Sequence, residues 1–66
     1  MNVTVNGFQR EVADRCPLLD LMKQLDLRPG MTVVERNGAI LKADQLADTV
    51  LAENDVLELV RFVGGG

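Results

Sequence analysis

Residues 17–25 read PLLDLMKQL, and this stretch predicts a short amphipathic helix. Its apolar side chains recur at the spacing of one helical stripe, at Leu18, Leu21, Met22 and Leu25. Pro17 suits the first turn of a helix, where its missing N–H costs no hydrogen bond. The breaker Arg28-Pro29-Gly30 should end the helix near Asp26. Because a helix of about two to three turns cannot persist alone in water, it must pack on another layer.

A β-hairpin is predicted on each side of this helix. Before it, residues 3–5 alternate apolar and polar, Asn6-Gly7 is a strong turn signal, and residues 8–13 form the returning strand. The two central positions of a type I′ turn need positive φ, which Asn and Gly adopt readily. The same pattern follows the helix, where strands at 32–36 and 39–41 are joined by Asn37-Gly38.

The last third of the chain predicts one helical turn followed by the most strand-like segment of the sequence. The helical turn is expected at residues 43–46, with Leu46 and Val50 buried. A tight turn at 53–55 then leads into a strand at 56–63.

The final strand has two different faces. Alternation along the strand places Leu57 and Leu59 on one face, and Val60 and Phe62 on the other. One helix can cover only one face, which we expect to be that of Leu57 and Leu59. An exposed apolar patch at Val60 and Phe62, extended by Val33 of the central strand, is typical of a partner-binding surface. The alternative is that other parts of the chain bury these side chains.

The order of these elements predicts an α+β fold in one domain. Two hairpins flank one helix and a strong strand comes last, so a mixed sheet of four to five strands carries one main helix on one face. This is a β-grasp arrangement, with the order of the strands taken by analogy. The domain is expected over residues 1–63, and a flexible Gly-Gly-Gly tail over residues 64–66.

The composition excludes several classes of function. The 66 residues include no His, no Ser and a single cysteine, Cys16, so a thiolate–imidazole zinc site, a cysteine-ligated iron–sulfur cluster and a Ser-His-Asp or Cys-His triad are ruled out. The net charge is -3 and the basic residues are scattered, which argues against nucleic acid as a partner. No run is apolar enough for a membrane span and no signal peptide is visible, so a cytoplasmic protein is expected.

The remaining polar residues predict little chemistry. We expect the acids of the helix, turns and loops to form a solvated surface, at Asp14, Asp20, Asp26, Asp44, Asp48, Glu53 and Asp55. Cys16 is expected to be partly buried and inert, the alternative being a redox thiol. Two interpretations of Arg61 stay open: it is a solvated charge, or it pairs with an acidic residue of a partner.

Four segments of the chain resemble the ThiS family, the ubiquitin-like β-grasp sulfur carriers of thiamine biosynthesis. They are residues 3–7, 18–25, 33–40 and 54–66, and the last segment, NDVLELVRFVGGG, is the most specific. Together they cover almost the whole chain. One departure is Cys16 before Pro17, where a hydroxyl cap would be more usual.

The resemblance implies a function for the end of the chain. In this family an E1-like enzyme of the ThiF type uses ATP to adenylate the C-terminal glycine carboxylate, which is Gly66 here. The adenylate then becomes a thiocarboxylate, with sulfur that comes indirectly from a sulfur donor enzyme. Thiazole synthase of the ThiG type receives this sulfur. The chain itself would then be no enzyme and would bind no cofactor, since ATP belongs to the activating partner.

The predicted site therefore has two parts. Gly64 and Gly65 lack Cβ atoms and would let the tail thread through a narrow channel into a partner's nucleotide site. The partner-binding residues are predicted to be Val60, Phe62, Val33 and Glu58. Two other functions stay open: the small subunit of a molybdopterin synthase-like sulfur transfer complex, and a β-grasp binding module that is no carrier.

Overall fold

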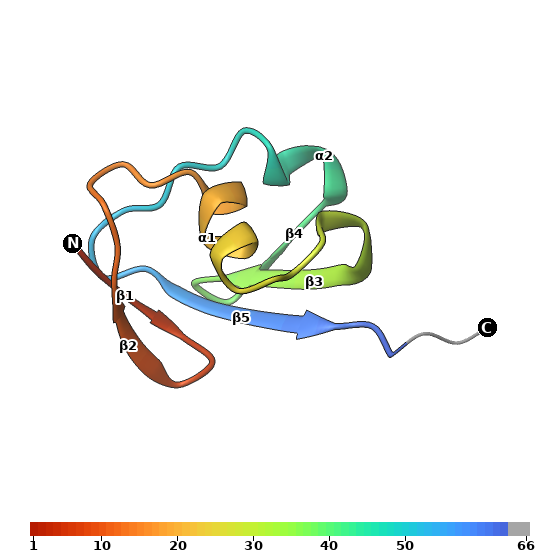
Figure 1. Cartoon of the computed structure of the whole chain (residues 1–66), viewed down its shortest axis with the longest axis horizontal. Helices are drawn as coiled ribbons and strands as arrows, with labels where there is room; N and C mark the ends of the chain where they lie inside the picture. The colour runs from red at the N-terminus through yellow and green to blue at the C-terminus, as the bar shows by residue number, and fades with distance from the viewer. Residues whose placement is uncertain (64–66) are drawn as a thin grey trace.

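The computed structural model describes residues 1–63, which form one five-stranded sheet with a main helix across it (Figure 1). The predicted tail, residues 64–66, lies outside the described residues. The elements in chain order are β1 (Asn2–Val5), β2 (Phe8–Glu11), α1 (Leu18–Gln24), the 3₁₀ helix η1 (Pro29–Met31), β3 (Thr32–Arg36), β4 (Ala39–Leu41), α2 (Ala43–Leu46) and β5 (Val56–Arg61).

The sheet is mixed, with the strand order β2-β1-β5-β3-β4. β1 and β5 run parallel at its centre, and the pairs β1–β2, β3–β5 and β3–β4 are antiparallel. The strand that comes last in the sequence therefore lies in the middle and joins the two hairpins. The α+β class and the mixed sheet with one main helix are confirmed, and the strand order is now observed.

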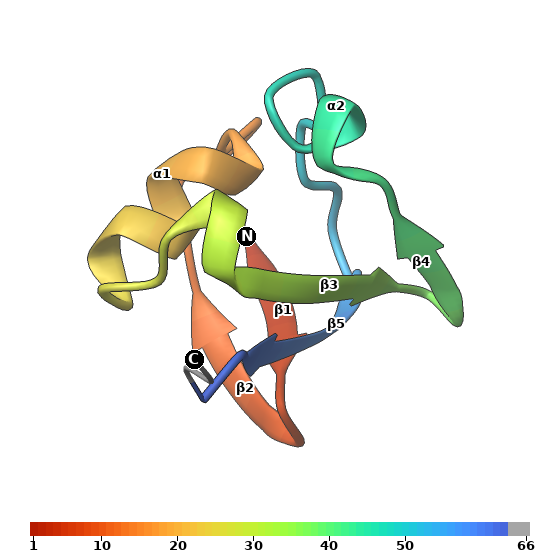
Figure 2. The same cartoon turned by 90° about the vertical axis from the view of Figure 1, so that its right-hand side faces the viewer.

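The main helix α1 covers one face of the sheet, so the core lies between the two layers (Figure 2). The largest fully buried side chains come from both layers: Leu18, Leu21 and Met22 of α1, and Val3, Val34 and Leu57 of the sheet. The predicted apolar stripe of the helix is thus confirmed, and Leu25 at its end packs against the core while partly exposed. Pro17 caps the start of the helix in an extended conformation.

Both hairpin turns have the backbone that their Asn-Gly sequences predict. Asn6 and Gly7 have φ of 49° and 86°, and Asn37 and Gly38 have φ of 51° and 88°. Positive φ at both central residues matches a type I′ turn, whose twist suits the flanking strands. The turn residues therefore set the register of each hairpin.

Three sequence predictions need correction. The second strand ends at Glu11 and the last at Arg61, so both are two residues shorter than expected. Val50 is 50% exposed, and its neighbour Leu51 is buried in its place. The backbone explains this, because the N–H of Leu51 donates to the carbonyl oxygen of Cys16 at 2.9 Å and holds this stretch of chain beside the start of α1.

Asp55 is not part of a solvated surface, as the sequence suggested, but is buried in a hydrogen-bonded network. Its carboxylate accepts from the Arg36 guanidinium (Nη2 to Oδ2, 2.9 Å), the Asn37 side-chain amide (3.0 Å) and the backbone N–H of Ala52 (2.8 Å). Burial alone would raise the pKa of Asp55, but the hydrogen bonds from Ala52, Asn37 and Arg36 outweigh it and hold the pKa below its ordinary value. The network ties the turn before β5 to the β3–β4 hairpin.

Candidate functional site

The face of the sheet opposite α1 is open, and β5 carries exposed apolar side chains on it. Val60 is 59% exposed and Phe62, just after the strand, is 52% exposed, whereas Leu57 and Leu59 on the other face are buried. The alternation predicted for this strand is confirmed, and no other part of the described chain buries Val60 and Phe62. Their role in binding a partner stays a prediction.

The strand register brings the predicted binding residues together. Val33 of β3 lies directly opposite Val60 of β5, and Glu35 lies directly opposite Glu58. Residues paired in this way in an antiparallel sheet project from the same face. Val33, Glu58 and Val60 therefore share one surface. Together with the exposed Phe62, which follows the strand, we call this surface the docking patch.

Two neighbours of the docking patch were missed by the sequence reasoning. Glu35 sits beside Glu58, and Ile40 of β4, which is 67% exposed, is paired with Glu35. The signal for Ile40 was available, because a two-residue turn at Asn37-Gly38 puts residue 40 opposite residue 35. The position of Glu35 beside Glu58 could not be predicted, because it depends on β3 pairing with β5, and the sequence does not give the strand order.

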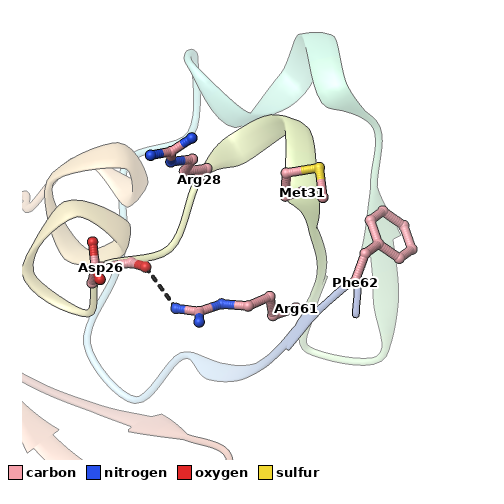
Figure 3. Close-up of a pocket in the computed structure, with 5 residues that line it drawn as sticks. All are labelled: Asp26, Arg28, Met31, Arg61 and Phe62. Carbon is pink, nitrogen blue, oxygen red and sulfur yellow. Dashed lines mark hydrogen bonds between the residues drawn. The ribbon is translucent and has the colours of Figure 1, made fainter. Parts of the chain in front are cut away.

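A pocket of about 330 Å³ lies where the chain leaves β5 (Figure 3). Its lining residues come from the loop after α1 and from the end of the last strand: Asp26, Arg28, Met31, Arg61 and Phe62. Figure 3 shows the Arg61 side chain crossing the pocket toward Asp26, and the Arg28 guanidinium pointing away from Arg61.

Two hydrogen bonds hold the end of β5 to the segment between α1 and β3. The Arg61 guanidinium donates to the backbone carbonyl oxygen of Asp26 (Nη2 to O, 2.8 Å), and the N–H of Phe62 donates to the carbonyl oxygen of Met31 (2.8 Å). Arg61 is therefore not a freely solvated charge, and its pairing with an acidic residue of a partner stays a prediction. Val63, the next residue, is 96% exposed.

The other candidate groups take no part in this site. The Cys16 thiol is buried and donates to the carbonyl oxygen of Pro17 (3.4 Å). Burial, aided by the nearby Asp20 carboxylate, raises the pKa of the Cys16 thiol, which disfavours the reactive thiolate. Within residues 1–63, no group of three or more His, Cys, Asp or Glu side chains is placed to hold a metal ion. No helix of that same part of the chain is long and apolar enough to cross a membrane.

The predicted reactive and threading residues, Gly66, Gly64 and Gly65, lie outside the described residues. The structure does place Arg61 and Phe62, which come shortly before these glycines and line the pocket.

Comparison with known proteins assigns the family. The model of the ThiS family matches residues 3–66. The chain belongs to the ThiS family. The match includes both hairpins, the helix, the last strand and the terminal glycines, so the family assignment does not rest on the tail alone.

Individual ThiS relatives agree with this assignment. The chain is 36% identical over 53 residues to the sulfur carrier protein ThiS of Bacillus subtilis, covering 80% of each protein. The crystal structure of the thiamine biosynthesis protein ThiS from Geobacter metallireducens superposes over the whole of both chains with a TM-score of 0.82 at 32% identity.

A second group of relatives consists of longer proteins. The chain is 33% identical over all 66 residues to a thiazole synthase of Magnetococcus marinus, of which it spans 20%. It is 30% identical to a thiazole synthase of Paramagnetospirillum magneticum, again spanning 20% of that protein. In both, a ThiS-like segment is thus part of a polypeptide named for thiazole synthesis.

Proposed function

We propose that this chain is a sulfur carrier of thiamine biosynthesis, which other enzymes activate and discharge. The observation that carries the proposal is the ThiS family match over residues 3–66, which spans the β-grasp body and the terminal glycines together. The resemblance to the ThiS family implies that the chemistry takes place on a carboxylate at Gly66. A body without His or Ser, whose single thiol is buried, agrees with this role. The chain is a co-substrate and not an enzyme.

The chemistry proceeds in two balanced steps. An oxygen of the Gly66 carboxylate attacks the α-phosphorus of ATP, the bond to pyrophosphate breaks, and an acyl-adenylate forms. Hydrosulfide, or an equivalent from a sulfur donor enzyme, then attacks the acyl carbon. The C–O bond to AMP breaks, AMP and a proton leave, and the chain ends in a thiocarboxylate. ATP is bound by the activating partner, and its use fits a cytoplasmic reaction.

The body of the carrier presents a surface suited to an E1-like activating enzyme. The docking patch combines exposed Val60 and Phe62 with Glu58, and Glu35 lies beside it. Aromatic and aliphatic anchors of this kind contribute most of the energy of many interfaces. The acidic pair favours a partner surface with basic side chains, because complementary charges speed association and exclude wrong partners.

The length of chain that follows Phe62 suits insertion into a partner. The residues 63–66 follow Phe62, and four extended residues span about 13 Å. A carboxylate at that distance can enter a nucleotide site while the docking patch stays on the enzyme surface. Glycines at 64–66 have no side chains that would obstruct a narrow channel.

Thiazole synthase is the proposed recipient of the sulfur. The relatives from Magnetococcus marinus and Paramagnetospirillum magneticum join a segment similar to this chain to a protein named thiazole synthase. Two activities on one polypeptide often serve one pathway, which supports thiazole formation over other uses of the same tail.

The experiment that tests this function follows the sulfur. The purified chain is incubated with ATP, the E1-like enzyme and the sulfur donor of its own organism, and the product is then offered to thiazole synthase or to the large subunit of molybdopterin synthase. We expect a thiocarboxylate that is consumed by thiazole synthase. Consumption by the molybdopterin synthase subunit alone would assign the pterin pathway, and a chain that never gains sulfur would contradict the carrier function.

A further inference from the structure

The point at which the chain leaves the sheet is held by Arg61. This residue lies opposite Thr32 in the β3–β5 register, on the face covered by α1, in line with Leu57 and Leu59. Those side chains are short and end in the core. Arg61 is long enough to pass beneath the end of the helix layer and reach the loop beyond it.

The acceptor in that loop is a backbone atom. Arg61 donates to the carbonyl oxygen of Asp26, whose φ of 58° is left-handed and turns the chain out of α1. One residue further along, the N–H of Phe62 donates to the carbonyl oxygen of Met31, which ends η1. The two bonds attach the last residue of β5 and the residue after it to the two ends of one loop.

This loop is itself held firmly. The Thr32 hydroxyl donates to the carbonyl oxygen of Arg28 (2.7 Å), and the N–H of Met31 donates to the same oxygen (2.9 Å). The N–H of Leu27 donates to the carbonyl oxygen of Met22 in α1 (2.8 Å). The end of β5 is therefore fastened to a segment that is itself fixed to the helix.

We infer that Arg61 is a positioning residue for activation: its bond to Asp26 fixes the place at which the chain leaves the sheet after β5. This inference rests on the proposed function. Activation requires a docked body and a carboxylate at the α-phosphorus at the same time, and misplacement by about 1 Å can cost up to about a hundredfold in rate. The alternative, an anion-binding site formed by Arg28 and Arg61, fits the pocket less well. Figure 3 shows the Arg28 side chain turned away from Arg61.

The test separates docking from positioning by steady-state kinetics of adenylation, followed as pyrophosphate release with the E1-like enzyme. Arg61→Gln removes the donor that reaches Asp26 and changes no side chain of the docking patch. We expect kcat to fall about tenfold with KM little changed, because the body still docks but the carboxylate reaches the nucleotide less often. Asp26→Asn is the matched control, since it keeps the accepting backbone carbonyl, and Asn tolerates positive φ.

A second readout does not depend on activity. Hydrogen exchange of the Phe62 amide, which reports its bond to Met31, should be faster in Arg61→Gln and unchanged in Asp26→Asn, with melting temperature as the check on folding. A rise in KM that depends on salt, with kcat unchanged, would show that Arg61 contacts an acidic group of the enzyme and would overturn the inference. Wild-type kinetics in Arg61→Gln would also overturn it. A wild-type chain that is not adenylated would instead contradict the proposed function, and the positioning role with it.

Discussion

At the scale of single residues, Asp55 and Phe62 show an unusual distribution of polar and apolar side chains, because the charged one is buried and the aromatic one is exposed. Asp55 is 5% exposed and fully hydrogen-bonded, while Phe62 is 52% exposed on the open face. Sequence reasoning placed Phe62 on the open face because strand alternation decides it. It misplaced Asp55, because its partners Arg36 and Asn37 are close only through the β3–β5 register.

Asp55 is predicted to make stability depend on acid. Its folded pKa is lowered, so its contribution is complete above the unfolded pKa of about 3.9 and is lost as pH falls through the lower folded pKa. Asp55→Asn should cost about 1–2 kcal/mol of unfolding free energy at neutral pH and flatten the loss below pH 4. Urea denaturation between pH 2 and pH 7 (about the span of the effect) measures this.

The control for this prediction is Asp14→Asn, which removes the same charge from a side chain that is 91% exposed. It should leave the neutral stability near that of the wild type. An Asp55→Asn variant as stable as the Asp14→Asn variant at neutral pH would contradict a structural role for the network.

Phe62 is predicted to matter for binding more than for folding. Phe62→Ala should weaken binding to the E1-like enzyme by about 1–3 kcal/mol, because truncating an aromatic anchor removes its contacts with the partner. It should lower the unfolding free energy by about 1 kcal/mol or less, since half of the ring is already in water. Calorimetric titration and urea denaturation measure the two quantities.

The chain supplies a matched control in its other aromatic residue. Phe8 is 79% exposed and lies on the edge strand β2, two strands from β5. Phe8→Ala should leave binding near the wild-type value. Equal losses of binding and stability in Phe62→Ala would mean that the ring serves the fold.

At the scale of elements, local signals predicted the secondary structure well, and long-range pairing did not follow from them. Residues that are adjacent in sequence were enough to predict three features: the Asn-Gly turns, the Leu18–Met22 part of the stripe and the β-branched strand at 32–36. The central position of β5 and the inward turn of Leu51 depend on segments far away in sequence. The order β2-β1-β5-β3-β4 therefore does not follow from the local signals.

The β3–β5 pair also contains a feature that stability alone would not favour. Glu35 and Glu58 lie directly opposite each other, and like charges at such positions are destabilising. Glu58→Lys should raise the unfolding free energy by about 0.2–1 kcal/mol and slow association with the E1-like enzyme, whose surface we propose to be basic. Urea denaturation and stopped-flow association at two salt concentrations measure the two effects.

Glu11→Lys makes the same change of net charge on the exposed edge strand β2, where Glu11 is paired with Asn2. Its association rate should change less than that of Glu58→Lys. If both variants slow association equally, net charge explains the effect and Glu58 has no special place in docking.

At the scale of the whole molecule, a small body carries its candidate site at one end. The pocket and the two bonds of residues 61 and 62 lie where β5 ends. The docking patch lies beside them on the face of the sheet opposite α1. The sequence predicted the β-grasp body and the docking patch, since both follow from alternation and one helix. It did not predict the bond from Arg61 to Asp26, because a backbone acceptor has no signature in the sequence.

The central claim is that Gly66 carries sulfur, and intact-mass spectrometry tests it most directly. After incubation with ATP, the E1-like enzyme and the sulfur donor, the wild-type chain should gain the mass of one sulfur-for-oxygen exchange. Fragmentation should place that exchange at Gly66, and omission of ATP should prevent it. A chain that lacks Gly66 but is otherwise intact should gain nothing. An unchanged wild-type mass, or the same gain after Gly66 is removed, would contradict the claim.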